Sequence, residues 1–166
     1  MSKNKKILII STGGTFNKEY LPKEGTLRVD ESSKAVYDIA SKWLCEFEVL
    51  NIIGKDSLEM NSQDRLELLA TIIQSDYKDI IVIHGTDTME LSAEYLADAD
   101  EEKRIVMTGA MVPYAVDPVE ATANLASAFG YIQTLEKEGV YIVINGVFGA
   151  YNKIKKDRKN GKFIVS

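Results

Sequence analysis

The regular alternation of short apolar runs with longer amphipathic segments is the feature that most limits how this chain can fold. The runs are rich in β-branched residues and cover residues 6–11, 47–53, 80–83, 104–107 and 140–144. Continuous apolar runs of this length are typical of parallel strands that are covered on both faces. Strands that alternate with helical segments at this spacing indicate βαβ units and a parallel sheet.

Four helical segments are expected between these runs, because their apolar residues recur at spacings of three and four. They cover residues 33–44, a segment that begins at Asn61 or Ser62, residues 88–97, and a segment from Asp117 to about Glu136. The last has the clearest start: Asp117 suits an N-cap, Pro118 the first helical position, and Glu120 completes a capping box. We therefore predict an α/β fold of three layers, Rossmann-like or flavodoxin-like, with a mostly parallel sheet and helices on both faces.

The length of 166 residues is close to that of one average domain. Hydrophobic residues make up 45% and charged residues 27%, which favours a folded chain over a disordered one. Neither an internal repeat nor a low-complexity linker divides the sequence, so we predict one domain over residues 1–166. Residues 16–32 have mixed charge and little periodicity, which indicates a long loop or a hairpin, with a mobile lid as one interpretation.

Composition excludes several kinds of site. Cys45 is the only cysteine and His84 the only histidine, so neither an intramolecular disulfide nor a zinc site built from cysteines and histidines is possible. We expect no metal and no organic cofactor. The net charge of −5 disfavours nucleic-acid binding as the main activity, since phosphate neutralisation needs a basic face. A basic stretch over residues 153–162 keeps a nucleic-acid contact as the least favoured alternative.

The apolar runs are too short for secretion or membrane insertion. The first run contributes only four apolar residues, Ile7 to Ile10, whereas a signal peptide needs roughly 7–15. No later run approaches the roughly 18 residues that span a bilayer. We therefore expect a cytoplasmic protein with no membrane contact.

Glycine, hydroxyl and small polar residues follow every predicted strand. These segments are residues 12–15, 54–57, 84–88, 108–111 and 145–146. Ligands of open α/β sheets bind beyond the carboxyl ends of the strands, so this edge is the predicted site. Nucleotide binding is disfavoured, because neither the dinucleotide fingerprint nor the P-loop motif is present.

Two of these segments together point to a family. Residues 12–15 read Thr-Gly-Gly-Thr and residues 84–89 read His-Gly-Thr-Asp-Thr-Met, a combination that resembles the L-asparaginase and glutaminase family of bacterial amidohydrolases. Residues 109–113 are similar to that family's G-A-M-x-P turn, and residues 56–60 to its D-S-x-D-M substrate loop. The resemblance covers nearly the whole chain in the family's order.

The resemblance implies a set of catalytic residues. Amide hydrolysis needs a nucleophile, a group that takes its proton, donors for the oxyanion and an acid for the leaving nitrogen. The residues that match the family's catalytic positions are Thr15, Tyr20, Thr86, Asp87 and Lys156, with Lys155 as the alternative lysine. Thr15 is then the nucleophile, Tyr20 contacts it from the following loop, and the other three form a Thr-Lys-Asp triad.

The same resemblance implies substrate contacts. Asp56 belongs to the substrate loop, and Ser57 is expected to bind a substrate carboxylate. Asp87 is expected to bind an ammonium group, while the backbone at Gly85 and Ala110 holds the amide. Other interpretations of the same residues remain: Thr86 and Asp87 as a helix cap, Tyr20 as an exposed loop aromatic, Lys156 as one of a solvated basic run, and His84 as a framework residue.

Full-length members of the family carry a second, C-terminal α/β domain, which we expect to be absent from this chain because it ends at Ser166. The predicted function is hydrolysis of the side-chain amide of L-asparagine or a related small carboxamide to acid and ammonia, through a threonine acyl-enzyme. The alternative is a weakly active or inactive binding module for an amino acid or a small anion. The family assembles as oligomers, so a homodimer is possible.

Overall fold

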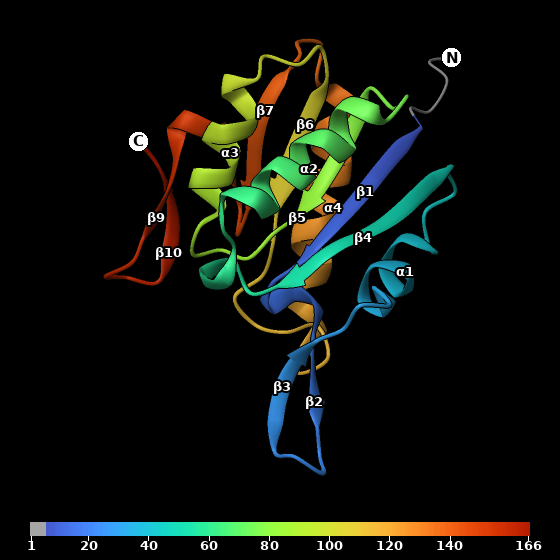
Figure 1. The fold of residues 1–166 in the computed structure, drawn as a ribbon, viewed down its shortest axis with the longest axis vertical. Coiled ribbons are helices and arrows are strands. Elements are labelled where there is room, and N and C mark those ends of the chain that lie inside the picture. The colour runs from blue at the N-terminus through green and yellow to red at the C-terminus, as the bar shows by residue number, and fades with distance from the viewer. Residues whose placement is uncertain (1–5) are drawn as a thin grey trace.

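A six-stranded sheet runs through the centre of the molecule in the order β4-β1-β5-β6-β7-β8 (Figure 1). The computed structural model describes residues 6–166. Five strands are parallel: β1 Ile7–Gly13, β4 Phe47–Lys55, β5 Asp79–Ile83, β6 Arg104–Thr108 and β7 Gly139–Ile144. The sixth, β8 Val147–Ala150, is antiparallel to β7. Numbered along the chain, the parallel strands follow the flavodoxin-like order 2-1-3-4-5, which confirms the predicted fold class.

Helices cover both faces of this sheet (Figure 1). Helices α1 Lys34–Ala40 and α4 Pro118–Thr134 lie on one face, and α2 Ser62–Gln74 and α3 Met89–Asp98 on the other. Strand β1 shows why the apolar runs are continuous. Ile7 and Ile9 pack in the cluster under α1 and α4, while Leu8 and Ile10 pack in the cluster under α2 and α3. Because successive side chains of a strand point to opposite faces of the sheet, both faces of β1 are buried and residues 7–10 are all apolar.

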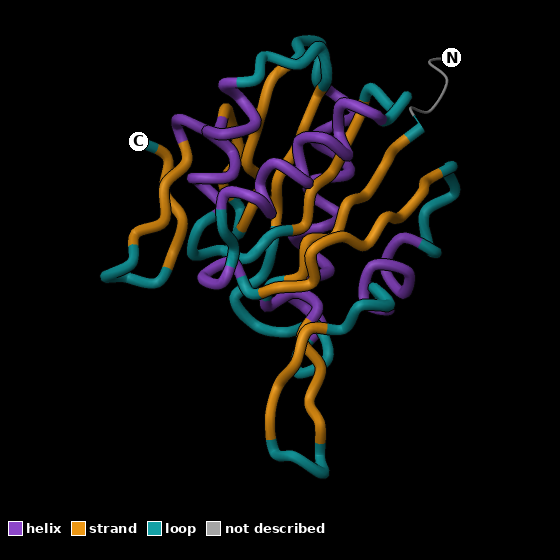
Figure 2. Tube along the Cα trace, viewed as in Figure 1, coloured by secondary structure: helices purple, strands orange, loops and turns teal. Residues whose placement is uncertain are grey.

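The basic stretch near the C-terminus folds as a hairpin. A 3-10 turn, η3 Tyr151–Lys153, leads into β9 Ile154–Asp157, which pairs antiparallel with β10 Lys162–Val165. The hairpin lies beside α3 (Figures 1 and 2). Ile154 and Phe163 anchor it, because both are buried in the cluster under α2 and α3. This anchoring fixes where the lysines of β9 point.

A second hairpin lies within residues 16–32, the segment for which the sequence predicted either a loop or a hairpin. After a 3-10 turn, η1 Thr15–Asn17, strands β2 Lys18–Leu21 and β3 Thr26–Val29 pair antiparallel. Figure 2 shows this hairpin extending away from the sheet. One ion pair ties its base to the body of the molecule: Lys18 Nζ lies 2.6 Å from Asp56 Oδ2.

Two local predictions need correction. The first expected helix, residues 33–44, ends at Ala40. Trp43 lies beyond the end of this helix and stacks on Phe129 of α4, with ring centroids 4.1 Å apart, and Leu44 is 97% exposed. The helical spacing of these two residues was therefore coincidental.

The capping box at the start of α4 was also predicted wrongly. Asp117 is the N-cap, and its Oδ1 accepts the Val119 N–H at 3.0 Å. Glu120, however, accepts the Met111 N–H with its Oε1 at 2.6 Å. Its carboxylate holds the loop after β6, so it does not turn back to the cap.

Asn145 and Gly146 follow the fifth parallel strand, and β8 lies between them and the basic stretch. They form a two-residue turn with φ values of 49° and 81° that joins β7 to β8. An Asn-Gly pair with positive φ at both positions is the favoured hairpin turn. Asn124 of α4 holds this turn, accepting the Asn145 N–H at 2.9 Å.

Two glycines with positive φ, one packed closely and one in open space, allow a test of what the close approach requires. Gly14 has φ +76°, and a Cβ there would lie 2.6 Å from the Gly85 nitrogen; Gly146 has φ +81° with no atom within 4 Å. Gly146→Ala should lower the free energy of unfolding by about 1–2 kcal/mol, from backbone strain alone. Gly14→Ala should cost more than about 3 kcal/mol, because Gly14 has φ 76° and ψ −179°, a conformation essentially confined to glycine, and because the added Cβ clashes with the Gly85 backbone. Denaturant unfolding measures both; equal losses would contradict the close approach.

Candidate active site at the carboxyl edge of the sheet

The loops that follow β1, β4 and β5 approach one another closely at two glycines, Gly14 and Gly85. A Cβ at Gly14 would lie 2.6 Å from the Gly85 nitrogen, and a Cβ at Gly85 would lie 2.6 Å from both Cβ and Oγ of Ser57. Ser57 opens the 3-10 turn η2 Ser57–Glu59 and is 1% exposed. Because Gly14 and Gly85 carry no side chain, these loops approach closely, and Thr15 and Thr86, which follow the two glycines, are drawn to one place.

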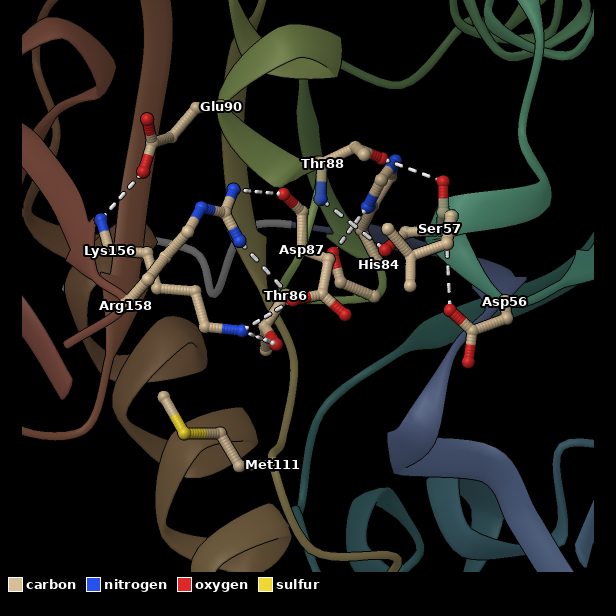
Figure 3. Close-up of polar contacts among 12 residues, drawn as sticks. Asp56, Ser57, His84, Thr86, Asp87, Thr88, Glu90, Met111, Lys156 and Arg158 are labelled. Carbon is tan, nitrogen blue, oxygen red and sulfur yellow. Dashed lines mark hydrogen bonds and ion pairs between the residues drawn. The ribbon is translucent and has the colours of Figure 1, made fainter. Parts of the chain in front are cut away.

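Lys156 reaches this place from the C-terminal hairpin. Its Nζ donates hydrogen bonds to Thr86 Oγ1 at 2.9 Å and to Asp87 Oδ1 at 2.8 Å (Figure 3). Its side chain is only 12% exposed. Lys155, the alternative lysine, is exposed, because neighbouring residues of a strand point to opposite sides. The three residues of the predicted triad are therefore in contact through Lys156.

Glu90, which the sequence analysis did not identify, fixes the backbone of Lys156. Its Oε1 accepts the Lys156 N–H at 2.6 Å, and it lies in the first turn of α3 (Figure 3). Ile154, two residues before Lys156 on the same strand, is buried in the core. Together they orient the lysine toward the end of β5. Glu90 and Lys156 are 66 residues apart in the chain, so no local sequence signal could have revealed their contact.

A solvent-open hollow of about 480 Å³ lies at this edge. Its lining residues are Thr15, Thr86, Asp87, Met111, Lys156, Arg158 and Gly161. The volume suits a small-molecule ligand. Four of the five predicted catalytic residues thus line one hollow, with two hydroxyl groups and two oppositely charged side chains among them.

Arg158 is a second residue that the sequence analysis missed. Its Nη2 donates to the backbone carbonyl of Asp87 at 2.6 Å, and its Nη1 lies 3.3 Å from Asp87 Oδ1 (Figure 3). The Arg158 side chain is 61% exposed and lines the hollow. Asp87 Oδ1 therefore accepts from both cations of the hollow.

The predicted carboxylate-binding segment lies beside this hollow rather than in its lining. Ser57 Oγ accepts the Thr88 N–H at 3.3 Å, and Thr88 Oγ1 donates to the Ser57 carbonyl at 2.9 Å. Asp56 pairs with Lys18, and the hydrogen bond from Lys18 is the main cause that holds the pKa of Asp56 below its ordinary value, against burial, which raises it. These contacts fix the loop, and a substrate role for Ser57 and Asp56 stays a prediction.

Tyr20 and Ala110 are placed differently from the triad. Tyr20 lies on the projecting β2–β3 hairpin and is 56% exposed, and within residues 6–166 no hydrogen bond joins it to Thr15. Ala110 is buried in the cluster under α1 and α4. Neither residue lines the hollow. The catalytic role of Tyr20 and the substrate contact of Ala110 therefore stay predictions.

A buried hydrogen-bond network supports the loop after β5. His84 is fully buried; its Nδ1 lies 2.7 Å from the Gly85 carbonyl and its Nε2 lies 2.7 Å from Ser92 Oγ. A carbonyl only accepts, so Nδ1 carries the hydrogen and Nε2 accepts from Ser92. Ser92 Oγ in turn accepts Arg65 Nε–H at 3.0 Å, and Arg65 Nη2 donates to Thr88 Oγ1 at 3.2 Å. His84 thus belongs to the framework.

A larger hollow of about 550 Å³ lies away from this chemistry, by the amino ends of β6 and β7. Four acids and one lysine line it: Asp100, Glu101, Glu102, Glu138 and Lys103. It contains none of the residues that the sequence analysis assigned to catalysis. The hollow around Lys156 is therefore the candidate site despite its smaller volume.

The comparisons with known proteins identify the family. A family model described as Asparaginase, N-terminal, matches residues 6–161. The chain belongs to the asparaginase family. Its asparaginase domain is 29% identical over 168 residues to a Haemophilus influenzae protein named "Probable L-asparaginase periplasmic", covering 90% of this chain and 46% of that protein. It is also 29% identical to a subunit of the glutamyl-tRNA(Gln) amidotransferase of Methanococcus maripaludis, covering 89% of this chain and 36% of the other.

The fold has close counterparts among solved structures. The thermostable L-asparaginase from Thermococcus kodakarensis superposes with a TM-score of 0.82 at 21% identity, over 96% of this chain and 51% of that one. The chain thus spans between 36% and 51% of the length of these three proteins. Among residues 6–166, no helix is long and apolar enough to cross a membrane. In the same range no group of three or more His, Cys, Asp or Glu residues is arranged to hold a metal ion.

The buried histidine makes a pH prediction. Burial, the largest cause, lowers the pKa of His84 from 6.5 to about 4. Between these values the unfolded chain binds a proton that the folded chain excludes, so the free energy of unfolding should fall by about 3 kcal/mol as pH drops from 6.5 to 4. Denaturant unfolding across this window measures the slope. His84→Gln should flatten it, and an unchanged slope in that variant would assign the effect elsewhere.

Proposed function

We propose that this asparaginase domain hydrolyses the side-chain amide of L-asparagine or a related small carboxamide to the acid and ammonia. The observation that carries the proposal is the pair of hydrogen bonds from Lys156 Nζ, at 2.9 Å to Thr86 and 2.8 Å to Asp87, in the hollow that Thr15 also lines. A hydroxyl nucleophile beside a lysine, a second hydroxyl and a carboxylate supplies the parts that acyl transfer needs. The names of the relatives, L-asparaginases and an amidotransferase subunit, support the same class of chemistry.

The proposed reaction proceeds through an acyl-enzyme on Thr15. The Thr15 oxygen attacks the amide carbon and loses its proton to a neighbouring group, and the C–N bond breaks as the nitrogen takes a proton and leaves as ammonia. Water then attacks the ester carbon, which releases the acid and restores the threonine hydroxyl. We propose that Lys156 and Thr86, which are joined by a hydrogen bond, relay a proton between the reacting atoms. Backbone N–H groups near Gly85 and Ala110 are proposed to stabilise the oxyanion.

The remaining features of the proposal follow from the sequence. We propose that residues 1–166 form one domain that works in the cytoplasm, without a metal or an organic cofactor, and takes a small-molecule amide as its partner. We propose no contact with nucleic acid or membrane. A homodimer is the proposed assembly.

One observation favours the alternative function, a binding module for an amino acid or a small anion. Tyr20, the expected partner of Thr15, is exposed on the projecting hairpin instead of lining the hollow. Hairpin movement toward the hollow would be needed to bring it to Thr15. A module that only binds needs neither the movement nor the nucleophile.

Ammonia release separates the two functions. Wild-type protein should release ammonia from at least one amide among L-asparagine, D-asparagine, L-glutamine and succinamate, each at millimolar concentration. Thr15→Ala should lower the rate by about 1,000-fold or more, because the nucleophile is removed. Ligand-dependent thermal stabilisation without ammonia would instead establish the binding module. Full activity in Thr15→Ala would contradict the proposed mechanism.

Two lysines on one strand give a matched test of the triad. Lys156→Gln should lower the rate of ammonia release by about 100-fold, since it removes the group that contacts both Thr86 and Asp87. Lys155→Gln removes an equal charge from an exposed position one residue away and should leave the rate unchanged. Similar losses in both variants would show that only the charge of the hairpin matters.

A further inference from the structure

Arg65, near the start of α2, is a partly buried cation that donates hydrogen bonds to three separate segments. Its Nε donates to Ser92 Oγ at 3.0 Å, its Nη2 to Thr88 Oγ1 at 3.2 Å, and its Nη1 to the Met60 carbonyl at 3.5 Å. All three acceptors are neutral oxygens, and they belong to α3, to its N-cap and to the loop after β4. A guanidinium group is planar and only donates, so it fixes the spacing of these acceptors and the direction of their own hydrogen bonds.

One chain of hydrogen bonds runs from Arg65 to Ser57. Thr88 Oγ1 accepts from Arg65, so its own hydrogen is free to donate to the Ser57 carbonyl, 2.9 Å away. The Thr88 N–H also donates to Ser57 Oγ, at 3.3 Å (Figure 3). Ser57 is thus held through both its carbonyl and its hydroxyl group. Because Ser57 is the residue predicted to bind a substrate carboxylate, this chain sets the place of the predicted substrate loop.

A second chain runs from Arg65 to Gly85. Ser92 Oγ accepts from Arg65, so its hydrogen is directed to His84 Nε2, 2.7 Å away. The other ring nitrogen, Nδ1, donates to the Gly85 carbonyl at 2.7 Å. Ser92 is 1% exposed and His84 is fully buried. The direction of this buried chain therefore depends on the donor at its head, which is Arg65.

The two chains end on residues that lie against each other. A Cβ at Gly85 would lie 2.6 Å from both Cβ and Oγ of Ser57. The chains therefore form a closed ring that begins and ends at Arg65. Such a ring fixes the separation between the loop after β4 and the loop after β5. Since neither Thr15 nor Lys156 belongs to the ring, it controls where the loops lie and leaves the reacting groups in place.

We propose that Arg65 is a positioning residue for substrate binding: through this ring it holds Ser57 against Gly85 and so sets the affinity of the site for its amide substrate. The inference rests on the proposed amide hydrolysis and on the predicted substrate contact of Ser57. It assigns to Arg65 an effect on binding, whereas the proposed role of Lys156 lies in turnover.

Arg65→Met removes all three donors and keeps much of the length of the side chain. With the amide that the wild type hydrolyses fastest, KM should rise about tenfold or more, while kcat should stay within about threefold. Thr88→Val cuts only the chain to Ser57 and should raise KM in the same direction. The double variant should raise KM about as much as Arg65→Met alone, because both substitutions break the same chain. A fall in kcat at constant KM, or additive effects on KM, would overturn the inference.

Lys103→Met is the matched control. Lys103 is also a buried cation, 7% exposed, and its Nζ donates to neutral oxygens, the carbonyls of Ser75 and Tyr77. It lines the hollow at the amino ends of β6 and β7, away from the ring. Lys103→Met should lower Tm, as Arg65→Met does, and leave KM unchanged. A similar rise in KM in both variants would show that lost stability, and not the ring, is the cause.

Two measurements that need no turnover separate this inference from the proposed function. If no amide releases ammonia, hydrolysis is refuted, and the Kd of L-aspartate, measured by calorimetry, then replaces KM; it should rise about tenfold or more in Arg65→Met. Hydrogen exchange of the Thr88 amide, which donates to Ser57 Oγ, should become faster in Arg65→Met and stay unchanged in Lys103→Met. In that case, no binding of L-aspartate by the wild type, or an equal Kd in Arg65→Met, would overturn the inference. Equal Thr88 exchange in the two variants would overturn it with or without turnover.

Discussion

The contact between the bare backbones of Gly14 and Gly85 is the constraint on which the rest of the site depends. It joins the loops after β1 and β5, which are neighbours in the sheet, and Ser57 closes against Gly85 from the loop after β4. Thr15 follows one of these glycines directly and Thr86 follows the other. Two hydroxyl groups from distant parts of the sequence therefore reach one hollow because nothing larger than hydrogen separates the turns before them.

Charged side chains form the second part of the site, beside the loops that the glycines bring together. The body of the fold presents Thr86 and Asp87 at the end of β5, and the C-terminal hairpin brings two cations to them, Lys156 from its strand and Arg158 from its turn. Burial of Ile154 and Phe163 anchors the hairpin from which both cations reach Asp87. Such anchoring suits a site whose charges must keep their geometry when a ligand enters.

Much of this arrangement could be predicted from sequence, because the signals were local. Five apolar runs predicted the five parallel strands, and their hydroxyl-rich and glycine-rich ends predicted the edge at which Thr15, Thr86 and Asp87 gather. The contacts that the sequence could not reveal join distant segments, such as Glu90 with Lys156 and Arg158 with Asp87. Other errors arose where tertiary contacts overrode a local pattern: Trp43 stacks on α4 beyond the end of its helix, and Glu120 binds a neighbouring loop instead of its own cap.

The central claim is that Thr15 attacks the amide carbon, and mass spectrometry of the acid-quenched protein tests it most directly. Protein is mixed with the amide that it hydrolyses fastest, quenched during turnover, and digested for peptide mapping. The account predicts an acyl adduct, with the mass of the substrate minus ammonia, on the peptide that contains Thr15, and no adduct in Thr15→Ala. An adduct on a different residue, or steady turnover in wild type and variant alike with Thr15 unmodified, would contradict it.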